Sequence, residues 1–376
     1  MNFGFTEEQE LLRKTARDFL SERASSARVR EVMEGPQTHD AALWTRLAEL
    51  GWTGLTLPES HGGAGLSLIE LCIVLEELGR ALAPVPFLPT AIAATAIAEL
   101  GSAAQQAQWL PEIAAGRCIA SIAIAEERGR DEPAAIALRA TPNGEGWCLD
   151  GRKLFVPDPQ AADLFVVVAR TGGEAAQGLG LFVVPAATPG LRVEPLRGMD
   201  LLRPLGQVAF ESVAVPAANL LADEVDAWPA IAGVLDLARV MISAEMVGGA
   251  DKCLEDSVKH AAERVQFGKP IGVHQAIKHK CADMLFQLES ARSLTYYAAW
   301  AARAEPEEAP LMAAMAKAYA SDAYRHVSAE NIQIHGGVGF TWEYDCHLYF
   351  KRAKSDEAWL GDGILNRERV AALLPV

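Results

Sequence analysis

The 376-residue sequence has few cysteines, and it lacks both a metal-binding pattern and a long apolar run. Its six cysteines are scattered, with no C-x-x-C pair and no ligand spacing, so we expect reduced thiols and no bound metal. The first residues lack the basic start and apolar core of a secretion signal, and no apolar stretch is long enough to span a bilayer. These absences favour a cytoplasmic protein with no membrane partner.

Positive charge is also in short supply. The chain has 34 Lys and Arg residues against 49 Asp and Glu, a net charge of −15, which argues against a nucleic-acid partner. Half of the residues are hydrophobic and 22% are charged, as in globular proteins. At this length the chain suits two or three domains rather than one core.

Three zones follow one another along the chain. Residues 1–117 are expected to form an N-terminal helical domain, because apolar residues recur there at helical spacing. Residues 118–218 contain six short β-rich runs separated by Gly, Pro and Asp turns, typical of a small barrel or open sandwich. Residues 219–376 return to long helical patterns, so we expect a C-terminal helical bundle. This order predicts an α+β fold with segregated layers.

Three motifs stand out in the last zone. Residues 264–271 read RVQFGKPI, residues 275–278 with 282–284 read QAIK and ADM, and residues 333–340 read QIHGGVGF. An Arg side chain can bind phosphate oxygens through two nitrogens, and glycines let backbone N–H groups approach an anion closely. Together these groups favour binding of a dinucleotide made of a pyrophosphate and flat rings.

In this order the motifs resemble the acyl-CoA dehydrogenase family, the flavoproteins that desaturate acyl-CoA thioesters. The resemblance covers essentially the whole chain. It implies a helical domain, a middle β domain and a C-terminal four-helix bundle, usually assembled into tetramers. It also implies FAD as cofactor, an acyl-CoA as substrate and electron-transfer flavoprotein as the usual electron acceptor.

The resemblance assigns FAD binding across a subunit interface to seven residues. They are Arg264, Gln266, Phe267, Gln275, Gln333, Gly336 and Gly337. Ordinary roles are the alternative, since Arg264 can complement a helix end and Gly268 can stop a helix. Agreement of all three motifs favours the cofactor site. The Gly-rich run after His335 follows a predicted helix, so it is no Rossmann fingerprint.

The sequence departs from the family at the catalytic base, which must take a proton beside the thioester carbonyl. Most members carry a Glu where this chain has Leu360, and a minority carry it where this chain has Ala238. Asp362 and Glu245 are the nearest carboxylates, but Asp362 suits a helix N-cap and Glu245 lies two turns beyond Ala238. The catalytic residue is therefore unassigned, with a partner's carboxylate as the third option.

The middle zone departs as well. The family's flavin-facing hydroxyls are replaced by Ala125 and by Pro157, which also lacks an N–H. Elements that serve a neighbour's flavin are thus retained, while those that hold the chain's own flavin are degraded. Hence we expect a homo- or hetero-oligomer with an acyl-CoA dehydrogenase homologue, and the pattern favours a subunit of a heteromeric enzyme. A non-catalytic subunit that completes a partner's flavin site, or a flavin-independent homo-oligomer, remains the alternative.

Overall fold

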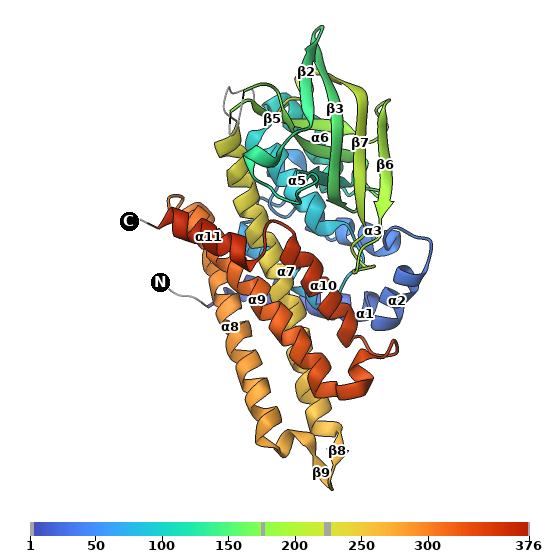
Figure 1. The fold of residues 1–376 in the computed structure, drawn as a ribbon, viewed down its shortest axis with the longest axis vertical. Coiled ribbons are helices and arrows are strands. Elements are labelled where there is room, and N and C mark those ends of the chain that lie inside the picture. Colours follow the sequence, from blue (N-terminus) through green and yellow to red (C-terminus); the bar gives the residue numbers. More distant parts are fainter. Residues whose placement is uncertain (1–3, 174–176, 222–226, 375–376) are drawn as a thin grey trace. The chain divides into compact units, whose positions relative to one another are not determined.

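The computed structural model describes residues 4–173, 177–221 and 227–374. They form two compact units. The helical unit combines Met1–Glu31, Leu68–Ala83 and Arg239–Val376, and the sheet unit combines Val32–Ser67 and Pro84–Ala238. The predicted α+β class is confirmed, because a sheet-forming segment lies between two helical ones along the chain (Figure 1).

Among the described residues, the sheet unit has seven strands rather than the six expected. They are β1 (Ala120–Ala123), β2 (Arg139–Asn143), β3 (Gly146–Pro157), β4 (Leu164–Arg170), β5 (Leu179–Pro185), β6 (Leu191–Leu196) and β7 (Leu205–Pro216). The order is β1-β4-β2-β3-β7-β6, with β5 paired to β4. Strand β2 escapes a sequence pattern because only Ala140 among its five residues is buried.

The core of this unit is apolar and aromatic. Phe165, Phe182 and Val208 are fully buried in it, with Leu149 and Phe210 beside them. Three helices accompany the sheet, namely α3 (Ala41–Glu49), α5 (Phe87–Leu100) and α6 (Ala103–Ala114). Helix α5 is joined to β1 by the Thr90 hydroxyl, which donates to the carbonyl of Ala120 at 2.9 Å.

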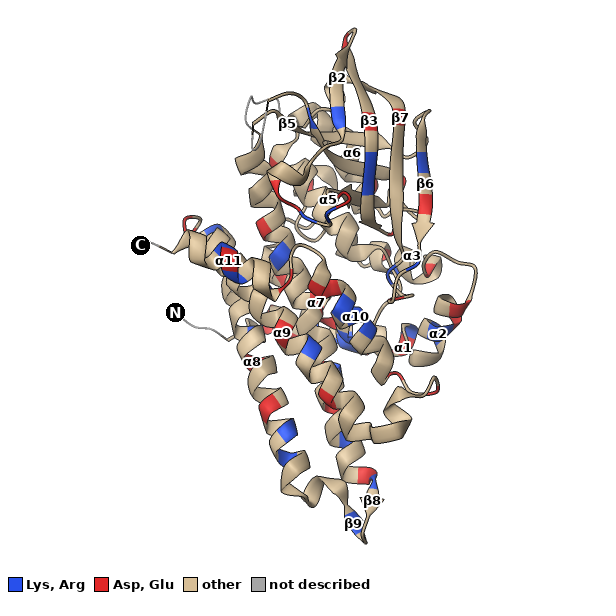
Figure 2. Cartoon of the chain, in the orientation of Figure 1, with Lys and Arg blue, Asp and Glu red and all other residues tan. Residues whose placement is uncertain are grey.

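The helical unit consists mainly of long helices. They are α1 (Glu7–Arg23), α4 (Leu68–Arg80), most of α7 (Trp228–Glu263), α8 (Gln275–Ala304), α9 (Ala309–His335), α10 (Cys346–Ala358) and α11 (Gly363–Leu373). Helix α10 was not expected, because its sequence is rich in charge and its apolar periodicity is weak. Acidic and basic residues are interspersed along α8, α9 and α10 (Figure 2).

Gly79 lies one residue before the end of helix α4. Helix α4 continues through it to Arg80. A Cβ atom at Gly79 would lie 2.1 Å from the carbonyl oxygen of Glu245, and one at Gly248 would lie 1.7 Å from that of Glu76. The two glycines therefore let α4 and α7 pack at backbone contact, which outweighs the cost of about 1 kcal/mol for glycine inside a helix.

Buried charges join four helices of this unit. Glu76 and Glu77 on α4 are 2% and 1% exposed. Glu77 accepts two hydrogen bonds from Arg17 on α1, at 2.9 and 2.8 Å. Glu76 accepts hydrogen bonds from Arg292 and Tyr296 on α8, and Arg292 also bonds to Asp251 on α7. Every carboxylate here has a positive or hydroxyl partner, as buried charge requires.

No helix of the described residues has the length and apolar character needed to cross a membrane. Within the same residues, no three His, Cys, Asp or Glu side chains converge on a possible metal position. All six cysteines are unpaired thiols.

Candidate functional site

The first motif forms a hairpin at the end of α7. Strands β8 (Val265–Gln266) and β9 (Lys269–Pro270) pair antiparallel around Phe267 and Gly268. Both turn residues are left-handed, with φ of 53° and 77°, as in the tight turns favoured by short hairpins. The turn leaves the side chain of Phe267 95% exposed. A bulky residue that is both strained and solvated contributes nothing to the core, which points to a role in binding.

Arg264 combines a fixed backbone with an available side chain. Its N–H donates to the carbonyl of His260, and its own carbonyl accepts from the N–H of Ile271, both at 2.8 Å. The guanidinium is exposed and forms no ion pair with any residue that the structure describes. Gln266 donates only to the adjacent carbonyl of Val265, at 2.9 Å, and Gln275 is exposed at the first position of α8. These side chains are thus free to meet a ligand.

The third motif ends α9. Gln333 is exposed in its last turn, and Gly336 follows the helix with a φ of 67°. A Cβ atom at Gly336 or Gly337 would meet nothing within 4 Å, so open space lies in front of both backbone groups. The prediction that this Gly-rich run follows a helix rather than a strand is confirmed.

One contact brings these motifs together. His260, four residues before Arg264, stacks on His335, two residues after Gln333, with ring centroids 4.1 Å apart. Helix α8 starts only five residues after the hairpin, so all seven candidates belong to the same end of the helical unit, marked by β8 and β9 in Figure 1.

This end fits part of a dinucleotide. It offers an unpaired guanidinium, three exposed amides, an exposed ring and two glycines facing open space. Guanidinium and backbone N–H groups suit phosphate oxygens, and amides suit the edges of a heterocycle. The set is open to solvent within a single chain, as expected of one wall of a site.

Both family positions for a base are apolar in the structure. Leu360 is 4% exposed and Ala238 is fully buried. Leu360 and Gly361 have left-handed φ angles of 60° and 84°. The loop they form is held by the buried Lys317, whose ammonium donates to the carbonyl of Gly361 at 2.8 Å and to that of Glu357 at 3.3 Å. The loop is therefore well ordered by hydrogen bonds, but the side chain of Leu360 cannot accept a proton.

The two substitute carboxylates have structural roles. Asp362 caps α11 by accepting from the N–H groups of Ile364 and Leu365, at 2.9 and 2.8 Å, as expected of an N-cap. Glu245 is 4% exposed and accepts from Arg352 at 2.7 Å. Each carboxylate is thus already used by the fold, Asp362 through Oδ1 and Glu245 through Oε1.

In the sheet unit, the residues around Ala125 and Pro157 bond to the protein itself. The carbonyl of Pro157 accepts from the hydroxyl of Ser121 at 2.6 Å. Glu126, next to Ala125, accepts from the backbone N–H groups of Ala137 and Leu138, at 2.8 and 3.0 Å. Its carboxylate is therefore committed to holding the loop between β1 and β2.

Sequence reasoning missed the cation that completes this arrangement, Lys153. Its ammonium is fully buried and donates to Glu126 at 2.7 Å and to the carbonyl of Ile124 at 2.9 Å. Burial lowers the pKa of Lys153 to about 8, although the charge of Glu126 acts in the opposite direction. No periodic signal marked it, because the register shift between Leu149 and Gly151 interrupts the alternation of β3.

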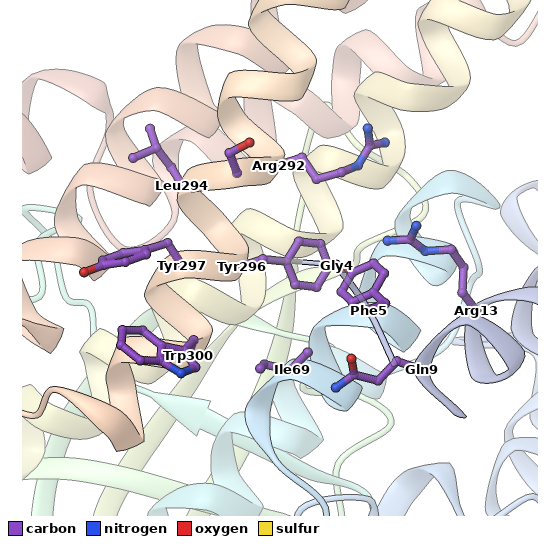
Figure 3. A pocket seen from close by; sticks show the side chains of 11 residues that line it. Gly4, Phe5, Gln9, Arg13, Ile69, Arg292, Leu294, Tyr296, Tyr297 and Trp300 are labelled. Atoms are coloured by element: carbon purple, nitrogen blue, oxygen red, sulfur yellow. The ribbon is translucent and has the colours of Figure 1, made fainter. Parts of the chain in front are cut away.

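A cavity of about 680 Å³ lies elsewhere in the helical unit (Figure 3). Its walls are mainly the rings of Phe5, Tyr296, Tyr297 and Trp300, with Arg13, Arg292 and Gln9 among the polar neighbours. Arg292 and the Tyr296 hydroxyl are bound to Glu76, and the Gln9 amide donates to Glu70 at 2.7 Å. The cavity contains none of the seven candidate residues.

The whole chain matches known protein families in three consecutive segments. Residues 6–117 match the N-terminal domain of acyl-CoA dehydrogenases, residues 121–213 the middle domain and residues 227–374 the C-terminal domain. The chain belongs to the acyl-CoA dehydrogenase family. As such it is an FAD-dependent oxidoreductase that acts on acyl-CoA thioesters.

Individual relatives of this acyl-CoA dehydrogenase agree with that assignment. Acyl-CoA dehydrogenase IpdE2 of Mycobacterium tuberculosis is 34% identical over 92% of this chain and 91% of its own length. Among solved structures, the Tcur3481-Tcur3483 steroid ACAD G363A variant has a TM-score of 0.89 and 34% identity, covering 98% of this chain and 97% of its own.

Two further structures are informative about assembly and cofactor. A chain of the ChsE4-ChsE5 complex of Mycobacterium tuberculosis has a TM-score of 0.90 at 29% identity. The match covers 100% of this chain and 100% of that chain. An FAD-dependent dehydrogenase has a TM-score of 0.89 at 29% identity over 99% of each chain. The relatives named here are dehydrogenases or complexes of their kind, so a purely structural subunit is not favoured.

Proposed function

We propose that this chain is one subunit of a heteromeric acyl-CoA dehydrogenase and supplies one wall of an FAD site at the hairpin end of its helical unit. The carrying observation is the set of unpaired polar groups gathered there. Arg264, Gln266, Gln275 and Gln333 extend into solvent from a fixed backbone, while Gly336 and Gly337 face open space. Phe267 completes the seven proposed FAD-binding residues.

Each residue type has a physical task in this proposal. Arg264 neutralises pyrophosphate charge and can bind two oxygens at once. The N–H groups at Gly336 and Gly337 approach the same anion without side chains in the way. Phe267 offers a flat face to a ring, and the glutamine amides orient it by hydrogen bonds. Bound FAD would supply the acceptor for the hydride that leaves the β carbon of the acyl-CoA.

The proton acceptor is assigned to a partner. Leu360 and Ala238 have no basic group, Asp362 caps a helix and Glu245 is paired with Arg352. A homologous subunit with Glu at either family position would provide the missing carboxylate within the shared enzyme. This arrangement also explains why the sheet unit lacks flavin-facing donors at Ala125 and Pro157.

Further assignments follow from the same family. We propose electron-transfer flavoprotein as electron acceptor and a division into domains at residues 1–117, 118–218 and 219–376. The six unpaired cysteines support a reducing compartment, and we propose the cytoplasm.

Co-expression tests the proposal directly. The chain is purified alone and together with an acyl-CoA dehydrogenase homologue that carries the Glu. We expect a colourless or weakly yellow protein alone, and a yellow complex absorbing near 450 nm, as oxidised flavins do, that reduces a dye with acyl-CoA. A chain that binds stoichiometric flavin and turns over alone would refute the heteromer. A complex that stays colourless would refute the flavin site.

A further inference from the structure

A pair of histidines lies directly behind the proposed flavin-binding residues. His260 on α7 and His335 on α9 stack with ring centroids 4.1 Å apart and planes inclined by 27°. The carbonyl of His260 accepts the N–H of Arg264 at 2.8 Å, and the residue after His335 is Gly336. The stack therefore joins the backbone of the hairpin to the backbone of the Gly-rich segment.

A second contact strengthens this junction one helical turn away. The hydroxyl of Ser257 donates to the side-chain oxygen of Asn331 at 2.8 Å, and both side chains are fully buried. Asn331 also accepts, through its carbonyl, from Nδ1 of His335 at 2.8 Å. Because a carbonyl only accepts, Nδ1 carries the proton, and the neutral ring keeps its lone pair on Nε2. Helices α7 and α9 are thus held in one register next to the hairpin and the Gly-rich segment.

Charged and titratable groups reach the pair from each neighbouring segment. Glu263 and Arg264 act on His260 from its own helix, and His335 acts on it from α9. The ring of Tyr344, in the segment before α10, contacts His335 edge-on at 6.0 Å. Burial is the largest cause of a lowered pKa at His260, followed by the charges of His335 and Arg264, with Glu263 opposing them. The environment therefore favours the neutral form of the His260 ring.

We propose that the His260–His335 stack is a positioning element that keeps Arg264 and the Gln333–Gly337 segment in register for flavin, and that protonation of His260 separates the two rings and releases the flavin. The proposal rests on the FAD site proposed above. Two stacked rings tolerate at most one added charge, because like charges at this separation disfavour each other.

The direction of the pH effect follows from the lowered pKa of His260, because the folded state favours the neutral form of this ring. The contribution of the stack is complete above the ordinary histidine value of about 6.5 and is lost as pH falls through the lowered pKa of His260. Flavin retention should therefore be full at pH 8 and decline on the acid side of about pH 6.5.

Flavin release from the purified complex tests this inference. The complex is equilibrated at a series of pH values from 8 down to 5, and the fluorescence of released flavin is measured after filtration. The wild type should release flavin as pH falls, whereas His260→Phe, which keeps a flat ring at this position without a titrating nitrogen, should release it at least about one pH unit lower. His335→Ala, which removes the ring, should weaken flavin binding about tenfold even at pH 8.

A control and a second measurement separate the possible failures. His326→Phe changes another histidine of α9 outside the stack and should reproduce the wild-type profile. In the apo chain, NMR titration should show the pKa of His260 rising in His335→Phe, because a neighbouring charge has gone. Identical release profiles and an unchanged His260 titration would overturn the positioning role while leaving the flavin site intact. A wild-type complex without flavin at pH 8 would overturn both.

Discussion

The hairpin after α7 and the loop before α11 share a local conformation but differ in everything around it. Phe267 and Leu360 are both non-glycine residues with left-handed backbones, at φ of 53° and 60°. Phe267 is 95% exposed and stands among unpaired side chains, whereas Leu360 is 4% exposed. Backbone strain alone therefore does not identify a binding site. Unpaired polar groups near the strained residue are the more informative sign.

The loop at Leu360 is held from two sides. Lys317 donates to the carbonyls of Gly361 and Glu357, and Asn366 donates to those of Leu360 and Gly361, at 3.2 and 2.8 Å. These hydrogen bonds offset the backbone strain of the loop within the helical unit. At the hairpin, by contrast, the exposed side chains add little to folding, and this leaves their chemistry available for a ligand.

Among substitutions that test this difference between the loop and the hairpin, the largest expected effect on stability is at Lys317. Lys317→Met removes a fully buried ammonium and leaves two buried carbonyls with one donor fewer. We expect the free energy of unfolding to fall by about 2–4 kcal/mol, the range for losing a buried hydrogen-bonded charge. Denaturant titration measures it. Lys354→Met, at a lysine 38% exposed and paired with Glu357, serves as control and should cost less than about 1 kcal/mol.

The opposite outcome is expected at Arg264. Arg264→Ala should lower flavin affinity of the complex about 10- to 100-fold, because a charge-assisted contact to phosphate is lost, while the unfolding midpoint stays unchanged. Equilibrium dialysis of flavin against the apo complex measures the affinity. Arg303→Ala removes an exposed arginine at the other end of α8 and should leave flavin binding intact. Equal affinities of the two variants would contradict the assigned role.

Glycine and alanine substitutions sharpen the comparison of the two strained residues. Leu360→Gly should lower the free energy of unfolding by about 2 kcal/mol, since loss of a buried side chain exceeds the relief of strain. Phe267→Gly should be neutral or stabilising by up to about 1 kcal/mol, because its ring buries almost nothing.

Alanine is the matched control at each position. It shortens the side chain but keeps the steric cost of a positive φ, so Gly should be more stable than Ala by about 1 kcal/mol at both positions. Thermal or chemical unfolding gives these differences. A hairpin in which Ala equals Gly would show that the left-handed turn at Phe267 is absent in solution.

Sequence patterns predicted the parts of this structure that depend on neighbours in the chain. Asp362 caps α11, as its position before a predicted helix suggests. The order of helical and β-rich zones followed from the periodicity of apolar residues. In each case the physical cause lies within a few residues of its effect.

What the sequence could not predict depends on contacts between distant residues. Lys317 acts on Gly361, 44 positions away, and His260 meets His335 across two helices. Helix α10 has a charged sequence, and the partner that makes its Arg352 tolerable in the interior is Glu245 on α7. No local pattern encodes such pairs, so neither the rigid loop nor the histidine junction was foreseeable.

The smallest predicted effect concerns the sheet unit, where Lys153 is as fully buried as Lys317. Because the pKa of Lys153 is lowered to about 8, the folded state prefers a neutral amine more than the unfolded chain does. Stability from this group is complete above the ordinary lysine value near 10.5 and declines as pH falls towards 8. We therefore expect the free energy of unfolding to rise by about 1 kcal/mol between pH 9 and 10 relative to Lys153→Met, which cannot titrate. A difference that is flat or falls with pH would mean that the ion pair with Glu126, rather than burial, controls this lysine.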